Sequence, residues 1–129
     1  MLENPNMVTM LPASDTERAK KWYSENLGLD PTMEDEAFGL YYETGRVKFA
    51  IYQSEFAGTN KATAAALEAD NFDAVVAQLK ANGVHFEEVD FGEMGKTVDG
   101  VISMPDGRKG AWVKDSEGNI LGLSTPWEA

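Results

Sequence analysis

The feature that most constrains the fold is a repeated pair of helix start and stop signals. Asp15 and Asp70 each precede a segment with helical apolar periodicity, and Gly28 and Gly83 follow those segments. Both pairs lie 55 residues apart, from 15 to 70 and from 28 to 83. Polar residues commonly begin helices, and glycine commonly ends them. Equal spacing of two such signals predicts an internal duplication of one supersecondary unit.

Each copy is predicted to contain a strand, a helix and about three further strands. The first strand covers residues 8–13, and Ser14 with Glu17 has the spacing of a capping box for the first helix. Alternating apolar residues over 37–43 and 47–53 flank Thr44 and Gly45, which predicts a two-residue hairpin turn. In the second copy the strands are expected at 62–69, 101–104, 110–114 and 120–124. We therefore predict an α+β single domain over residues 1–129, with module one at about 6–54 and module two at about 62–125.

Composition excludes several classes of function. The 129 residues carry 11 Lys and Arg against 22 Asp and Glu, so the net charge is −11, which disfavours nucleic acid and anionic membranes as partners. The chain has no cysteine, which excludes disulfides, thiolate nucleophiles and cysteine-bound metals. It has a single histidine, His85, and neither a signal-peptide pattern nor a membrane-length apolar run. A cytoplasmic location is the expectation.

Two stretches carry distinctive patterns, namely residues 11–29, with the aromatic pair Trp22 and Tyr23 before Leu-Gly, and residues 111–123. Both resemble the vicinal oxygen chelate superfamily, which includes glyoxalase I, extradiol dioxygenases and bleomycin resistance proteins. Ser116 and Glu117 depart from the Pro-Asp of the family's second pattern. The resemblance implies two tandem βαβββ modules that form an open curved sheet cup. It also implies a homodimer with its cups at or near the subunit interface.

The resemblance also indicates where metal-dependent members place their ligands. The corresponding positions are Val8, Thr63 or Ala64, Gly122 and a residue near Phe49. Divalent metals need imidazole or carboxylate ligands, which these side chains do not supply. We therefore predict no metal and no cofactor, which disfavours glyoxalase and dioxygenase chemistry and indicates the metal-free, bleomycin-resistance-like branch.

The cup lining follows from strand alternation, if Phe49 faces the cup. The two-residue turn would then pair Leu40 with Phe49 and Phe38 with Ile51. Glu68 would share the cup side of its strand, while the parity of the strands that carry Met104 and Trp112 stays open. The predicted ligand-binding residues are Phe38, Leu40, Tyr42, Phe49, Ile51, Glu68, Met104 and Trp112.

An apolar, aromatic-lined cup is typical of a small-molecule site. The main hypothesis is a binding protein with no catalytic residues that sequesters an aromatic natural product or antibiotic, with a cationic ligand compatible with the acidity. The first alternative is a metal-independent isomerase or lyase of the same superfamily that uses Glu68 or His85. A metal-dependent enzyme comes third. A regulatory partner comes last, because the sequence shows no recognition helix and no basic face.

Overall fold

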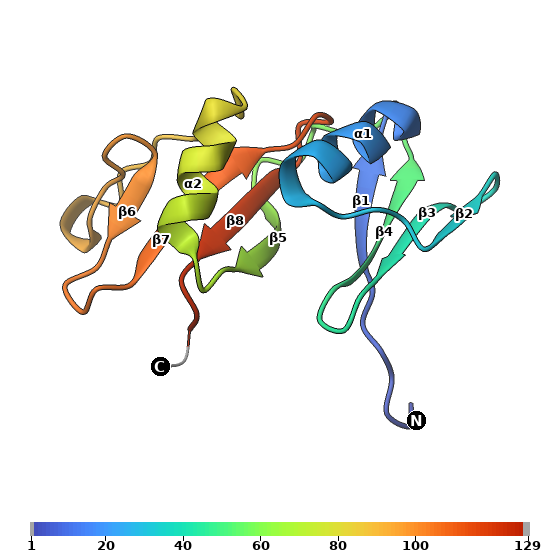
Figure 1. The fold of residues 1–129 in the computed structure, drawn as a ribbon, viewed down its shortest axis with the longest axis horizontal. Helices are drawn as coiled ribbons and strands as arrows, with labels where there is room; N and C mark the ends of the chain where they lie inside the picture. Colours follow the sequence, from blue (N-terminus) through green and yellow to red (C-terminus); the bar gives the residue numbers. More distant parts are fainter. Residues whose placement is uncertain (1, 128–129) are drawn as a thin grey trace.

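The computed structural model describes residues 2–127, which form two four-stranded sheets, two α-helices and one short 3-10 helix, Gly92–Met94. Figure 1 shows the two halves of the chain side by side, with the N-terminal segment leading away from the body. Module one consists of β1 (Thr9–Ala13), α1 (Thr16–Leu27), β2 (Met33–Asp35), β3 (Gly39–Glu43) and β4 (Lys48–Gln53). Module two consists of β5 (Thr63–Glu68), α2 (Phe72–Ala81), β6 (Val101–Ser103), β7 (Lys109–Lys114) and β8 (Ile120–Ser124).

The two sheets have the same topology. Their strand orders are β1-β4-β3-β2 and β5-β8-β7-β6. In each sheet the first strand pairs in parallel with the last, and the remaining pairs are antiparallel. This arrangement confirms the predicted α+β class and the duplication of a βαβββ unit. No helix within residues 2–127 is long and apolar enough to cross a membrane.

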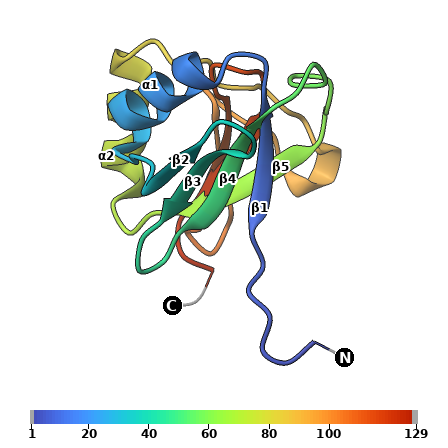
Figure 2. The same cartoon turned by 90° about the vertical axis from the view of Figure 1, so that its right-hand side faces the viewer.

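Both helices lie on the same side of the molecule (Figure 2). The core lies between the helices and the sheets and includes residues of both modules, such as Leu11, Tyr23 and Phe49 of module one with Val76 and Leu121 of module two. The opposite face of each sheet, turned away from the helix of its own module, is called its open face below.

The two helices begin differently, and both starts correct the sequence prediction. Asp15 caps α1, since its side chain accepts a hydrogen bond from the Arg18 N–H at 3.0 Å. The predicted capping box of Ser14 and Glu17 is therefore wrong by one residue. Asn71, rather than Asp70, precedes α2, and its side chain makes no cap hydrogen bond. Gly28 ends α1 in the left-handed conformation, at φ 67°, as predicted.

The β3–β4 hairpin also differs from its prediction. Residues 44–47 form the connection, closed by a hydrogen bond from the Thr44 N–H to the Val47 carbonyl at 2.8 Å. The longer loop pairs Leu40 with Ile51 and Tyr42 with Phe49. The predicted pairing of Leu40 with Phe49 is wrong, because loop length fixes hairpin register.

Candidate functional site

The open face of module one is apolar and rich in aromatic and thioether side chains. On neighbouring strands β1 and β4, Met10 pairs with Ala50 and Pro12 with Tyr52. Tyr41 of β3 pairs with Ala50 from the other side. Successive strand residues point to opposite faces, so these side chains face away from α1, while their neighbours enter the core.

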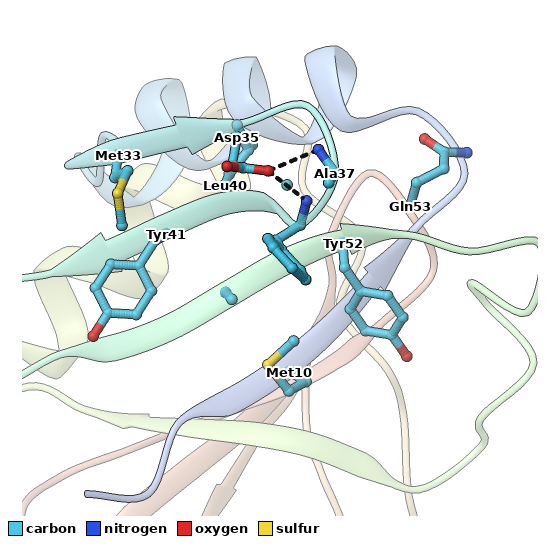
Figure 3. Close-up of a pocket in the computed structure, with 11 residues that line it drawn as sticks. Met10, Met33, Asp35, Ala37, Leu40, Tyr41, Tyr52 and Gln53 are labelled. Carbon is cyan, nitrogen blue, oxygen red and sulfur yellow. Dashed lines mark hydrogen bonds between the residues drawn. The ribbon is translucent and has the colours of Figure 1, made fainter.

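Met10, Tyr41, Ala50 and Tyr52 line a cavity of about 360 Å³ on this open face. Figure 3 shows Met10, Met33, Tyr41 and Tyr52 around it, carried by β1, β2, β3 and β4. Phe38 also lines the cavity, although 79% of it is exposed to solvent. Apolar cavities with a few polar groups at the edge are the usual form of a small-molecule site.

The β2–β3 loop that carries Phe38 is held by local hydrogen bonds. Asp35 Oδ1 accepts the backbone N–H of Ala37 at 2.7 Å and that of Phe38 at 3.0 Å (Figure 3). Gly39 follows at φ 100°, and a Cβ there would stand 2.1 Å from the Ile51 carbonyl oxygen. Only glycine therefore lets this loop lie against β4.

The open face of module two holds a larger cavity of about 640 Å³ with a different chemistry. Trp112 of β7 and Phe91 meet edge to face there, with ring centroids 5.7 Å apart. Trp112 pairs with Gly122 of β8, and a Cβ at Gly122 would lie 3.8 Å from the indole Nε1. Polar side chains also line this cavity, namely Asn60, Lys61, Thr63, Glu87 and Lys114.

Four of the predicted ligand-binding residues lie in the core instead of the cup. Their exposed fractions are small: Leu40 4%, Tyr42 1%, Phe49 7% and Ile51 1%. Tyr42 and Phe49 stack with ring centroids 4.3 Å apart, and Tyr23 of α1 lies 5.6 Å from Phe49. These four residues of the predicted cup lining therefore lie on the face of the sheet that packs on α1.

The predicted faces are exchanged because the alternation was started at Phe49, one residue away from the position that faces the cup. The parallel pairs Met10 with Ala50 and Ala66 with Gly122 occupy matching places in the two sheets. The module-one position that matches Gly122 is therefore Ala50, the neighbour of Phe49. Because side chains alternate along a strand, a shift of one residue exchanges the two faces of the sheet. Starting the alternation from Ala50 would have placed Tyr52 and Tyr41 on the open face and Phe49 in the core.

The other four predicted residues lie apart from one another. Phe38 lines the module-one cavity, and Trp112 lines the module-two cavity. Glu68 ends β5, where its Oε1 accepts the Trp127 N–H at 3.2 Å. Met104 lies in the β6–β7 turn, where its backbone N–H donates a hydrogen bond to the Arg108 carbonyl at 2.8 Å. Of the eight predicted residues, Phe38 and the buried Leu40 thus line the module-one cavity, and Trp112 lines the module-two cavity.

The family's metal positions do not fit a divalent ion. Ala50, Gly122 and Val8 offer no ligand atom on their side chains, and Thr63 offers only a hydroxyl. Within residues 2–127, no three His, Cys, Asp or Glu side chains form a group that could hold a metal ion. The His85 side chain is 65% exposed, and its Nε2 lies 3.4 Å from a Glu87 carboxylate oxygen.

The β7–β8 turn joins the two modules through the buried carboxylates of Asp115 and Glu117. Glu117 accepts the backbone N–H groups of Ser14 and Asp15, each at 3.0 Å, and Arg18 Nε at 2.8 Å. Burial alone would raise the pKa of Glu117, but hydrogen bonds from Arg18, Ser116 and the Asp15 N–H lower that pKa to about 2. Glu117 therefore stays ionised and binds the start of α1.

A second buried contact lies beside this one. The Tyr23 hydroxyl donates to Asp115 Oδ2 at 2.6 Å, and Asn119 Nδ2 donates to the same oxygen at 2.9 Å. Burial, followed by the charge of Asp115 and this hydrogen bond, raises the pKa of Tyr23 far above its usual range. Asn119 also donates to the Pro12 carbonyl at 2.9 Å. Together these contacts fix the two modules, and hence their open faces, relative to each other.

Comparison with known proteins identifies the family. The model of the Glyoxalase/Bleomycin resistance protein/Dioxygenase superfamily matches residues 7–122. The chain belongs to this superfamily. Comparison with curated protein sequences gives no match.

Three solved structures of this superfamily fold are similar over nearly the whole chain. A lactoylglutathione lyase from Agrobacterium tumefaciens has 15% identity and a TM-score of 0.70, with 98% of each chain covered. A bleomycin resistance determinant encoded on the transposon Tn5 has 17% identity and a TM-score of 0.69, covering 96% of this chain and 99% of that one. TnmS3, an antibiotic binding protein from a Streptomyces species, has 22% identity and a TM-score of 0.63, covering 97% and 99%. At these identities the likeness establishes the fold, while function depends on the site.

Proposed function

We propose that this member of the superfamily is a metal-free binding protein that sequesters an aromatic natural product or antibiotic without converting it. The observation that carries this proposal is the open face of module one, where aromatic and thioether side chains enclose an apolar cavity of about 360 Å³. Planar ligands stack on such rings, and methionine adapts to their outlines. The aromatic corner of Phe91 and Trp112 supplies a second stacking surface.

The chemistry at the family's metal positions supports the absence of catalysis by a bound metal. Alanine, glycine and valine side chains stand where the resemblance expects ligands, so the open faces offer contact area and few reactive groups. Proteins of the same fold include an antibiotic binding protein and a bleomycin resistance determinant. The cytoplasmic location expected from the sequence is part of the same proposal.

Isothermal titration of the purified protein against planar antibiotics tests this function. The panel contains matched cationic and neutral compounds, so that the effect of the negative net charge is measured separately from stacking. Binding of an aromatic compound that is recovered unchanged after incubation supports the proposal. Absence of binding across the panel, or chemical conversion of the ligand, overturns it. Metal analysis of the purified protein tests the metal-free assignment, which a stoichiometric divalent ion would contradict.

We also propose that two copies of the chain associate through the module-one open face. Three apolar side chains along it are largely exposed: Met10 53%, Met33 59% and Phe38 79%. Exposed apolar patches of this kind mark interaction surfaces. Analytical ultracentrifugation is expected to show a dimer for the parent chain and a monomer for Phe38→Lys. A monomeric parent at high micromolar concentration would refute the association.

A second candidate function is a metal-independent isomerase or lyase. His85 Nε2 lies 3.4 Å from a Glu87 carboxylate oxygen, and Glu87 lines the module-two cavity, so these two side chains would supply an acid and a base at the edge of that cavity. Glu68 is the other candidate, at the end of β5. Turnover of a bound compound that is lost in Glu68→Gln or His85→Asn, with folding intact, would favour this enzyme over the binding protein.

A further inference from the structure

We infer a third cavity as a separate binding site for a short aliphatic carboxylate. It lies where the core side of the module-one sheet meets β5 of module two, and its volume is about 200 Å³. Its lining shares no residue with the open-face cavities of either module. The inference is therefore independent of the proposed function. Its apolar wall includes Leu11, Tyr23, Leu29, Phe49, Ala65 and Leu121.

The wall is built from both modules and from ordered segments. Leu11 and Phe49 come from neighbouring strands, Leu121 comes from β8, and their exposed fractions are 2%, 7% and 2%. The left-handed Gly28 turns the chain at the end of α1, and the Leu29 N–H then donates to the Tyr23 carbonyl at 3.1 Å. Contact with these apolar side chains removes hydrocarbon surface from water, which favours a ligand with an apolar chain.

The edge of this cavity is positively charged, although the whole chain carries −11. Arg46 and Lys48 are its only charged lining residues within residues 2–127. The Thr44 hydroxyl accepts the backbone N–H groups of Arg46 and Val47 at 3.3 and 3.1 Å, which orders the turn that carries the guanidinium. Lys48 Nζ lies 3.5 Å from a Glu43 carboxylate oxygen, whereas Arg46 forms no ion pair with any other described residue. One positive charge is thus left for an anionic head group.

The cavity volume limits the length of the hydrocarbon chain. A cavity of about 150 Å³ accommodates benzene, so 200 Å³ holds roughly six to eight carbon atoms. Arg46 and Lys48 favour a carboxylate at the open end, and guanidinium groups bind carboxylates through paired hydrogen bonds. An alkyl ammonium of the same length would bring its cation to the same two side chains and be repelled. Hexanoate and octanoate therefore match both the wall and the edge.

A titration series measures the two halves of this inference separately. The probes are butanoate, hexanoate, octanoate and decanoate, with octylamine and octanol as matched controls of opposite and zero charge. Affinity is expected to rise about fourfold per methylene while the chain still fits, and then to level off. Octylamine is expected not to bind. Equal binding of octylamine and octanoate, or no binding of any carboxylate, overturns the inference.

Two variants locate the site. Arg46→Gln is expected to weaken octanoate binding about fivefold and to leave octanol binding unchanged. Ala65→Leu places added volume inside the cavity and is expected to shorten the best chain by two or more carbons. Circular dichroism establishes that each variant is folded, and Arg46→Gln keeps the test available if Ala65→Leu does not fold. Octanoate binding that is unaffected by Arg46→Gln, or lost in Trp112→Ala, would assign it to another surface.

Discussion

Modules one and two share a strand order and differ in how their helices begin. Asp15 caps α1 and donates its own N–H to Glu117 of the other module, whereas Asn71 at the start of α2 makes no side-chain cap hydrogen bond. The first turn of α2 instead carries Asp73, which pairs with Lys109 at 3.0 Å on the surface. The two modules therefore share a topology but differ in what stabilises the start of each helix, and α1 of module one depends on a turn of module two.

The open faces differ in the same way. Module one presents methionine, tyrosine and phenylalanine around a small apolar cavity. Module two presents one aromatic corner, Phe91 with Trp112, among lysine, glutamate and asparagine side chains in a larger cavity. The duplicated backbone pattern sets where strands lie, while the side chains on the open faces are free to diverge because the core does not constrain them. Binding specificity is therefore expected to come from the contrast between the two faces.

The largest expected effect is the loss of support for α1. Glu117→Ala removes the acceptor for two backbone N–H groups and for Arg18, and we expect it to lower the free energy of unfolding by about 3 kcal/mol. Asp73→Ala is the matched control in α2, and its exposed ion pair predicts no measurable change. Urea denaturation measures both variants. Equal losses in the two would mean that the helices are supported alike.

The same carboxylate predicts a pH dependence. The pKa of Glu117 is about 2 in the folded chain and 4.5 when these contacts are absent, so folding favours the ionised form. Its stabilisation is fully present above pH 4.5 and is lost as the pH falls toward 2, amounting to roughly 3 kcal/mol. Denaturation of the parent chain and of Glu117→Gln at pH 7, 4 and 2.5 isolates this contribution. The stability difference between them should shrink toward low pH, and a constant difference would contradict the assignment.

Two buried tyrosines offer a smaller test. Tyr23→Phe removes the 2.6 Å hydrogen bond to the buried Asp115 and should cost about 2 kcal/mol. The Tyr42 hydroxyl is buried and has no hydrogen-bond partner among the described residues, and burial, with the charges of Asp30 and Glu34, raises its pKa to about 12. Tyr42→Phe should therefore be neutral or slightly stabilising. Thermal unfolding of the two variants measures the difference in stability. Equal losses of stability would show that the hydrogen bond to Asp115 does not stabilise the fold.

Much of the fold follows from local sequence signals. The repeat spacing, the glycine that ends α1 and the apolar run over residues 120–124 correctly predict the duplicated α+β unit and β8. The β3–β4 register does not follow, because Thr44-Gly45 has the composition of a two-residue turn while Val47 closes a longer loop. Nor does the Glu117 contact, since it joins residues about 100 positions apart that only tertiary packing brings together.

The candidate site was less predictable than the fold. Alternation correctly groups residues that share one face, so Leu40, Tyr42, Phe49 and Ile51 do lie together. Alternation does not indicate which face of the sheet is the core. Because the alternation was started from Phe49, the aromatic side chains of the core face were predicted to line the cup. The sequence offered a signal in Tyr41 and Tyr52, which alternate with the core residues. Their amphipathic side chains suit a half-exposed face.

The smallest expected effect distinguishes the two open faces as ligand surfaces. For an aromatic compound found by titration, Tyr52→Ala and Trp112→Ala each remove one stacking ring, and a ring that contacts the ligand should weaken binding about fivefold. Met104→Ala is the control in the β6–β7 turn and should change affinity little. If only one of the two ring variants loses affinity, that face alone binds the ligand. If both variants lose affinity, the two open faces contact one ligand. Because the two cavities are separate within a single chain, that ligand would then lie between the two proposed copies of the chain. Losses confined to Met104→Ala would reject both open faces.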